Sequence, residues 1–146
     1  MARILVVEDN PLNMKLVTVI LQRAGHEVIS AGDAEDAERK IDRQVPDLIL
    51  MDLGLPGKDG YAFTRELRLR PSTSRKPIVA VTAYAMKGDW EKARDAGCND
   101  YITKPIDGAY LSERVKYWLA VSPDGETTEA ADAIESRRVP SRASGG

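Results

Sequence analysis

Short runs rich in β-branched residues alternate with longer stretches of helical periodicity along this chain, and this alternation limits its fold more than any other feature. It is typical of repeated βα units, which build a parallel sheet with helices packed on its faces. The run Leu48–Met51 is apolar at every position, as expected for a central strand covered on both sides. The sequence predicts an α/β fold with strands at Ile4–Val7, Glu27–Ser30, Leu48–Met51, Ile78–Val81 and Tyr101–Thr103.

A helix is expected after each strand. Asn10 can cap the first helix, Pro11 fits its first turn, and Gly25 suits a left-handed residue beyond its end. Its apolar face is expected to consist of residues at three- and four-residue spacing, namely Leu12, Leu16, Val19 and Ile20. The later helices are expected from Asp33 to Ile41, from Tyr61 to Leu69, from Met86 to Ala96 and from Asp107 to Leu119.

The length of 146 residues supplies one domain, which we expect to occupy residues 1–121. Residues 122–146 are dominated by Ser, Pro, Gly, Glu, Thr, Ala and Arg and contain almost no large apolar side chain. Such a segment cannot offset the entropy lost on ordering, so we expect a flexible polar tail. A short helix within residues 128–138 is an alternative for part of it.

Charge and composition exclude several classes of function. The formal net charge is −2 with acids and bases interleaved, which gives no basic field for nucleic acid. No apolar run approaches the roughly 20 residues that span a bilayer, and the N-terminus lacks the layout of a signal peptide. Cys98 is alone, which excludes an intramolecular disulfide and a cysteine metal cluster. We therefore expect a cytoplasmic protein that binds neither nucleic acid nor membrane.

Polar residues stand directly after the predicted strands: Glu8 and Asp9, Asp52, Thr82 and Lys104. Because ligands bind beyond the carboxyl ends of the strands in an open parallel sheet, we expect these residues to share one site. Three crowded carboxylates repel one another unless cations neutralise them. Oxygen ligands without cysteine or a suitably placed histidine favour a hard ion such as Mg²⁺, so a metal ion and Lys104 would together neutralise the cluster.

This arrangement suits phosphoryl transfer, in which positioning and charge neutralisation supply most of the catalysis. Asp52 would be the nucleophile, since a carboxylate can attack phosphorus and form an acyl phosphate. Asp9 and Asp52 would hold the metal, with Glu8 acting mainly through a metal-bound water. Lys104 would contact the phosphoryl oxygens as a cation, and Thr82 would donate its hydroxyl to another of them.

The sequence resembles the response-regulator receiver family over about residues 2 to 121. The resemblance depends on several segments in the right order and spacing: Ile4–Asn10, Asp47–Asp52 with Leu55–Pro56 and Asp59–Gly60, Pro77–Ala83, and Ala96–Gly97 through Tyr101–Pro105. It implies a flavodoxin-like (βα)5 sandwich with sheet order 2-1-3-4-5. It also implies phosphorylation of Asp52 by the phosphohistidine of a histidine kinase or histidine phosphotransfer protein.

The resemblance further implies roles for individual residues. The ligands of Mg²⁺, or of Mn²⁺ in its place, would be Glu8, Asp9, Asp52 and the backbone carbonyl of Gly54. A cis peptide before Pro105 would place Lys104. On phosphorylation Thr82 would move toward the phosphoryl group and Tyr101 would turn inward, altering a face made by the helix at 86–96, the strand at 101–103 and the helix at 107–119. Downstream partners would read that face, with the protein monomeric or dimerising on phosphorylation.

Two positions set the expected lifetime of the aspartyl phosphate. The family varies two residues after the phosphoacceptor and two after the conserved hydroxyl, which here are Gly54 and Tyr84. We hypothesise that the Tyr84 ring screens the site from water. The first acidic position is Glu8, where many relatives have Asp.

Alternative functions remain open at the sequence level. The chain can be a single-domain regulator or phosphorelay member, a receiver excised from a hybrid kinase or longer regulator, or a scaffold that is never phosphorylated. A phosphohydrolase with an aspartyl nucleophile is disfavoured, because such enzymes usually carry a second aspartate where this chain has Gly54. We expect a phosphoacceptor that catalyses only its own phosphorylation and dephosphorylation. Tyr101 can also be only a packing residue.

Overall fold

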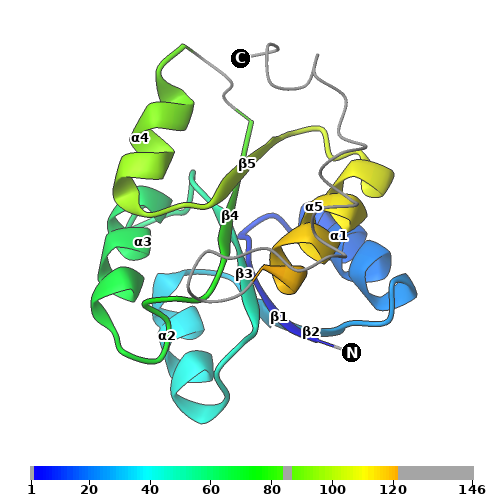
Figure 1. The fold of residues 1–146 in the computed structure, drawn as a ribbon, viewed down its shortest axis with the longest axis horizontal. Helices are drawn as coiled ribbons and strands as arrows, with labels where there is room; N and C mark the ends of the chain where they lie inside the picture. The colour runs from blue at the N-terminus through cyan, green and yellow to red at the C-terminus, as the bar shows by residue number, and fades with distance from the viewer. Residues whose placement is uncertain (1, 84–86, 122–146) are drawn as a thin grey trace.

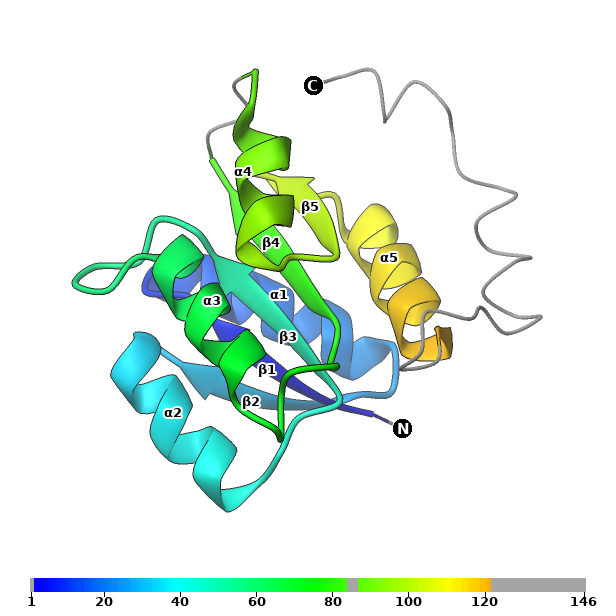
Figure 2. The same cartoon turned by 60° about the vertical axis from the view of Figure 1, so that its left-hand side comes forward.

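A five-stranded parallel sheet forms the centre of the molecule in the computed structural model, which describes residues 2–83 and 87–121. The strands lie in the order β2-β1-β3-β4-β5, the order implied by the family resemblance. All neighbouring pairs are parallel, so the carboxyl ends of the strands lie along one edge of the sheet (Figures 1 and 2). The strands are β1 (Arg3–Val7), β2 (Glu27–Ala31), β3 (Leu48–Asp52), β4 (Ile78–Thr82) and β5 (Asp100–Thr103).

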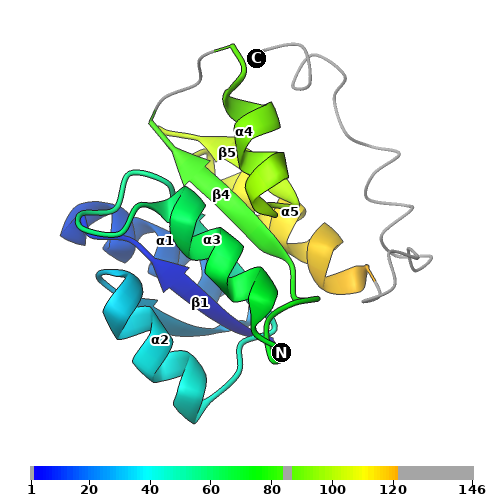
Figure 3. The ribbon, with the colours of Figure 1, turned by 90° about the vertical axis from the view of Figure 1, so that its left-hand side faces the viewer.

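Helices cover both faces of this sheet. In Figure 3, α2, α3 and α4 lie in front of the sheet and α1 and α5 lie behind it. The helices are α1 (Pro11–Arg23), α2 (Ala34–Arg43), α3 (Gly60–Leu69), α4 (Asp89–Ala96) and α5 (Gly108–Ala120). The layout is a flavodoxin-like three-layer sandwich, as predicted.

The core is divided by the sheet into two clusters. Alternate residues of a strand face opposite sides, so Leu5 and Val7 of β1 pack toward α2 and α3, whereas Ile4 and Val6 pack toward α1 and α5. Every residue of β3 and of β4 is buried. Apolar burial on both faces therefore holds the central strands in place and leaves their polar terminal residues at the carboxyl edge.

Local signals in the sequence place several helix ends. The Asn10 side chain accepts from the Leu12 and Asn13 amides at the start of α1, and Asp33, Asp59 and Asp107 cap α2, α3 and α5 in the same way. Gly25 and Gly97 adopt positive φ values of 92° and 119° just beyond α1 and α4. Gly25 was predicted at such a position.

The prediction of the inward face of α1 is right for Ile20, which packs against the core, and wrong for the other three residues. Leu12, Leu16 and Val19 are 77%, 44% and 38% exposed, and Val17 and Leu21 are the buried residues of α1. Seven of the ten residues from Leu12 to Leu21 are apolar, so the spacing fits more than one face and the packing of α1 on the sheet selects among them.

The start of α4 also differs from the prediction. The helix begins at Asp89, because Gly88 before it has a φ of 93° that cannot continue a helix. The predicted start at Met86, the Tyr84 hypothesis and the predicted tail at 122–146 lie outside the described residues. Within the described ranges, no helix has the length and apolar character needed to cross a membrane.

Candidate functional site

Three carboxylates meet at the carboxyl edge of the sheet, where β1 and β3 end side by side. Glu8, Asp9 and Asp52 each present a carboxylate oxygen within 4.8 Å of the other two. The pairing of Val7 with Met51 brings Glu8 level with Asp52, and both side chains are buried, while Asp9 is exposed. The sequence-based expectation that these strand ends converge agrees with this geometry.

Lys104 joins the cluster from the end of β5. Its Nζ lies 2.9 Å from Glu8 Oε1 and 3.4 Å from Asp52 Oδ2. Its backbone N–H donates to the Thr82 carbonyl at 2.8 Å, and the peptide bond between Lys104 and Pro105 is cis. A single ammonium group thus bridges two buried carboxylates in this state of the protein.

Burial and neighbouring charged groups shift the pKa values of Glu8 and Lys104. Burial raises the pKa of the Glu8 carboxyl above its ordinary value, and the nearby Asp52 adds to this, although hydrogen bonds from Lys104 and the Asn10 amide oppose it. Burial acts to lower the pKa of Lys104, but its hydrogen bond to Glu8 and the charges of Asp52 and Glu8 outweigh burial and raise that pKa. Lys104 therefore stays protonated, and one cation faces three carboxylates.

Asp52 is fixed in direction by the loop that follows it. The Gly54 N–H donates to Asp52 Oδ1 at 2.9 Å, which leaves Oδ2 toward Lys104. The loop returns at Gly60, whose N–H donates to the Leu53 carbonyl at 3.2 Å. A Cβ at Gly60 would lie 2.5 Å from the Asp52 carbonyl oxygen, so only glycine fits there. In the sequence, Asp59–Gly60 contributes to the family resemblance, but this steric role of Gly60 was not predicted.

Thr82 and Tyr101 occupy different places relative to the carboxylates. Thr82 is the buried last residue of β4, the strand next to β3, and pairs with Thr103. Tyr101 lies three residues before Lys104 on β5 and packs against Trp90 of α4, with ring centroids 6.2 Å apart at 55°. Thr82 is thus at the carboxyl edge, whereas Tyr101 belongs to the adjoining α4–β5 surface.

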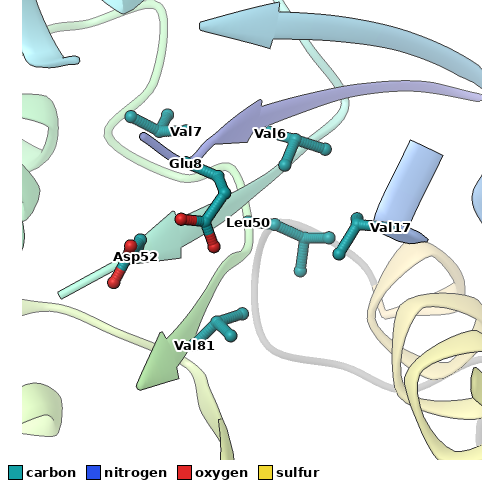
Figure 4. A pocket seen from close by; sticks show the side chains of 7 residues that line it. All are labelled: Val6, Val7, Glu8, Val17, Leu50, Asp52 and Val81. Carbon is teal, nitrogen blue, oxygen red and sulfur yellow. The ribbon is translucent and has the colours of Figure 1, made fainter. Parts of the chain in front are cut away.

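A small, mostly apolar pocket adjoins the Glu8 and Asp52 carboxylates. Figure 4 shows the Glu8 and Asp52 side chains close together, surrounded by apolar side chains from β1, β3, β4 and α1. Charges against such a lining are screened less than in water, which strengthens their attraction to a cation. The pocket is lined by Val6, Val7, Glu8, Val17, Leu50, Asp52 and Val81.

Comparison with known proteins identifies the family. Residues 4–116 match the model of the response regulator receiver domain. The chain belongs to the receiver family. The polar-differentiation response regulator DivK of Brucella anthropi is 40% identical over 116 residues, which span 80% of this chain and 94% of DivK. Proteins of the same name from Brucella ovis and Brucella abortus share the same identity and coverage.

Solved structures agree with this family. The receiver domain of the sensor histidine kinase PA1611 from Pseudomonas aeruginosa PAO1 is 42% identical, with a TM-score of 0.75, over 81% of this chain and 97% of that domain. That crystal structure holds a magnesium ion in its active-site cleft. The Mn²⁺-bound response regulator Rcp1 is 30% identical with a TM-score of 0.69, over 84% of this chain and 97% of Rcp1. The chain is therefore a receiver domain of two-component signalling, homologous to single-domain response regulators.

Proposed function

We propose that this protein is a single-domain response regulator whose Asp52 carboxylate accepts a phosphoryl group from the phosphohistidine of a histidine kinase or histidine phosphotransfer protein. One observation carries the proposal: the buried Asp52 carboxylate lies within 4.8 Å of two further carboxylates and 3.4 Å from Lys104 at the carboxyl edge of the sheet. Because such donors are charged from ATP inside cells, a cytoplasmic location belongs to the proposal.

Each residue of the site has a separate role in the phosphoryl transfer. An Asp52 oxygen forms a bond to phosphorus as the bond from phosphorus to the donor imidazole nitrogen breaks, and that nitrogen leaves with the bonding electrons. The Lys104 ammonium approaches the phosphoryl oxygens and offsets their charge, and the Thr82 hydroxyl donates to them. The Gly54 N–H holds the other Asp52 oxygen in place. The chain thus promotes its own phosphorylation and later dephosphorylation and acts on no external substrate.

The donor set fits a divalent cation. All three carboxylates offer oxygen, and their close approach against an apolar lining leaves excess negative charge after Lys104 is counted. Glu8, Asp9, Asp52 and the Gly54 carbonyl would hold Mg²⁺ or Mn²⁺, the ions present in the two similar structures. The ion would supply further neutralisation of the phosphoryl oxygens.

An exposed apolar stripe on α1 supports docking of the donor beside the site. Leu12, Leu16 and Val19 face solvent on the helix that starts directly after Asn10, two residues beyond Glu8. A partner helix packed on the α1 stripe, as we call these three residues, would bring its histidine to Asp52. Downstream partners would read the face of α4, β5 and α5, with the protein monomeric or dimerising on phosphorylation.

A small phosphodonor tests the chemistry without a partner. The protein is incubated with acetyl phosphate, with and without Mg²⁺, and phosphoryl uptake is read by intact mass for the wild type, Asp52→Asn and Asp59→Asn. The Asp59 variant is a matched control, since Asp59 caps α3 and asparagine caps equally well. We expect Mg²⁺-dependent gain of one phosphoryl group in the wild type and in Asp59→Asn only. Equal uptake in Asp52→Asn would refute the assignment of Asp52.

A receiver within a hybrid kinase is the second candidate, supported by the 42% identity to the receiver of PA1611. Both candidates share the chemistry at Asp52 and differ in whether the receiver is covalently joined to its kinase. Rapid phosphoryl transfer to this chain from a separate histidine kinase added in trans would favour the single-domain regulator.

A further inference from the structure

A buried polar cluster joins the start of β5 to α5, far along the strand from the carboxylate site. Asp100 is 6% exposed and Arg114 is 3% exposed. Asp100 Oδ2 accepts from Arg114 Nε at 2.7 Å and from Trp118 Nε1 at 2.8 Å. We call Asp100, Arg114 and Trp118 the Asp100 cluster. Arg114 and Trp118 lie one turn apart on α5, so both donors come from the same face of that helix.

Stability alone is a weak reason for such a cluster. Desolvation of a buried ion pair offsets most of its attraction, and apolar residues of similar volume often serve folding as well or better. Hydrogen bonds to a shared carboxylate oxygen do, however, impose direction and distance, which apolar packing does not. The Asp100 cluster therefore fixes the position of α5 relative to β5.

The same carboxylate is linked to Tyr101. Asp100 Oδ1 accepts from the Tyr101 N–H at 2.8 Å. Neighbouring residues of a strand face opposite sides of the sheet, so Asp100 points to α5 whereas Tyr101 packs with Trp90 of α4. Figure 1 shows β5 between α4 and α5. Two consecutive residues thus connect one strand to the helices on both of its sides.

The other end of β5 reaches the carboxylate site. Lys104 follows the strand directly and contacts Glu8 and Asp52, while β5 is an edge strand that pairs with β4 alone among the described strands. A phosphoryl group on Asp52 would add anionic oxygens that compete with Glu8 for Lys104. Strand β5 has four residues and begins at Asp100, so a shift of the strand at Lys104 would also displace Asp100.

We propose that the Asp100 cluster is the coupling element that transmits a displacement of β5 to α5, so that the surface of α5 responds to events at Asp52. This proposal rests on the proposed function for its trigger, but the coupling itself is a property of the unphosphorylated fold. Asp100, Arg114 and Trp118 act as positioning residues and contact no reacting atom.

The indole N–H signal of Trp118 in an NMR spectrum can report the coupling between β5 and α5 directly. The chain has two tryptophans, so a ¹H–¹⁵N spectrum contains two indole signals, which Trp90→Phe and Trp118→Phe assign. In the unphosphorylated protein, Tyr101→Ala disturbs β5 from the opposite side of the sheet. We expect the Trp118 indole signal to shift, because its acceptor is the carboxylate bonded to the Tyr101 N–H. An unchanged Trp118 signal would overturn the coupling, whatever happens at Asp52.

A second experiment tests the coupling in the phosphorylated protein. The wild type, Asp100→Leu/Arg114→Met, Trp118→Phe and the exposed α5 control Lys116→Ala are treated with acetyl phosphate and Mg²⁺. Intact mass measures phosphoryl uptake and hydrogen–deuterium exchange measures protection of α5. We expect equal uptake in all four proteins, and a phosphorylation-dependent change in α5 exchange that falls by more than half in the two cluster variants only. A full α5 response in those variants would overturn the proposal.

The two experiments distinguish failure of the proposed function from failure of the proposed coupling. The double variant replaces the ion pair by apolar residues, which preserves folding in comparable cases, and Trp118→Phe keeps an aromatic side chain while removing the N–H donor. Absence of phosphoryl uptake in the wild type would end the proposed function and leave the Tyr101→Ala spectrum to decide the coupling. Uptake without any α5 response in the wild type would overturn the coupling while leaving Asp52 as the acceptor.

Discussion

At the scale of single residues, Lys104 neutralises part of the negative charge of the carboxylate site. Its ammonium bridges Glu8 and Asp52 at 2.9 and 3.4 Å, in the region where a divalent cation would sit among the carboxylates. The lysine and a metal ion therefore neutralise the same oxygens and repel each other. The lysine reduces the repulsion among the carboxylates when no metal ion is bound, but it also weakens the binding of the metal ion.

Lys104→Met should tighten Mg²⁺ binding. Two unit charges 4 Å apart interact by ~4 kcal/mol at an effective dielectric constant of 20, so even partial relief of this repulsion should lower the Mg²⁺ Kd about tenfold, or ~1.4 kcal/mol. Calorimetric titration of the metal-free protein with MgCl₂ measures this Kd.

The exposed Lys116 on α5 supplies the matched control, and Lys116→Met should leave the Kd unchanged. The same Lys104 variant should take up phosphoryl groups from acetyl phosphate more slowly, because the phosphoryl oxygens lose a cation. Mg²⁺ binding that is weaker in Lys104→Met than in the wild type would contradict the account of shared neutralisation.

At the scale of elements, the sequence was sufficient to predict that α1 is a helix but not which of its faces packs against the sheet. Strand β3 could be predicted closely, because an unbroken apolar run ending in Asp52 has one plausible structure. Helix α1 could be predicted as a helix, but its many apolar residues are spread over more than one face and did not decide which face the sheet would cover. Its exposed leucines are therefore a property of the packed molecule and not of the local pattern.

Some contacts between residues far apart in the sequence could not be predicted either. The convergence of Glu8, Asp52 and Lys104 followed from the rule that parallel strands end at one edge. No comparable rule joins Asp100 to Arg114 and Trp118, which lie 14 and 18 residues away in sequence. The start of α4 depended on the left-handed backbone of Gly88, which the composition of the segment did not reveal.

The α1 stripe predicts a difference between protein and small-molecule donors. Leu12→Gln/Leu16→Gln removes apolar area while keeping good helix formers. Since burial of a leucine is worth about 1.5–3 kcal/mol, we expect kcat/KM for transfer from a phosphorylated phosphotransfer protein to fall at least about tenfold, which is ~1.4 kcal/mol. Uptake from acetyl phosphate should be unchanged. Radiolabelled phosphotransfer and intact mass measure the two rates.

Leu69→Gln is the control for this test, because Leu69 is 83% exposed at the end of α3, away from the α1 stripe. It should behave as the wild type with both donors. Equal loss of transfer from the protein donor in Leu69→Gln and in the double variant would show a general effect of surface leucines and would remove the assignment of the α1 stripe.

At the scale of the whole molecule, Cys98 reports how the domain opens. It is the only cysteine of the chain and lies buried, with its thiol 4.0 Å from the Thr64 hydroxyl. Burial raises the pKa of this thiol to about 11. The folded state therefore retains the proton at pH values where the unfolded state, with the ordinary value of 9.0, loses it. This group costs stability as pH rises from 9 toward 11 and has no such effect below that window.

Labelling of Cys98 should therefore be slow and controlled by opening of the fold. At pH 8 we expect the aromatic disulfide DTNB to react with the native protein far more slowly than with protein unfolded in guanidinium, since only the exposed thiol forms the reactive thiolate. A cation that binds the folded site alone stabilises it by ~2.7 kcal/mol at 100 times its Kd. If labelling requires global opening, Mg²⁺ at that level should slow it about a hundredfold.

Asp9→Asn/Asp52→Asn separates metal binding from a general effect of salt. This variant should lose the slowing by Mg²⁺, whereas NaCl at equal ionic strength should not reproduce the slowing in the wild type. Mg²⁺ that is shown by calorimetry to bind, yet leaves the labelling rate of the wild type unchanged, would mean that Cys98 becomes exposed through local opening around α3 and α4 while the carboxylate site stays intact. The sheet edge and the packing around Cys98 would then belong to separate cooperative units of the domain.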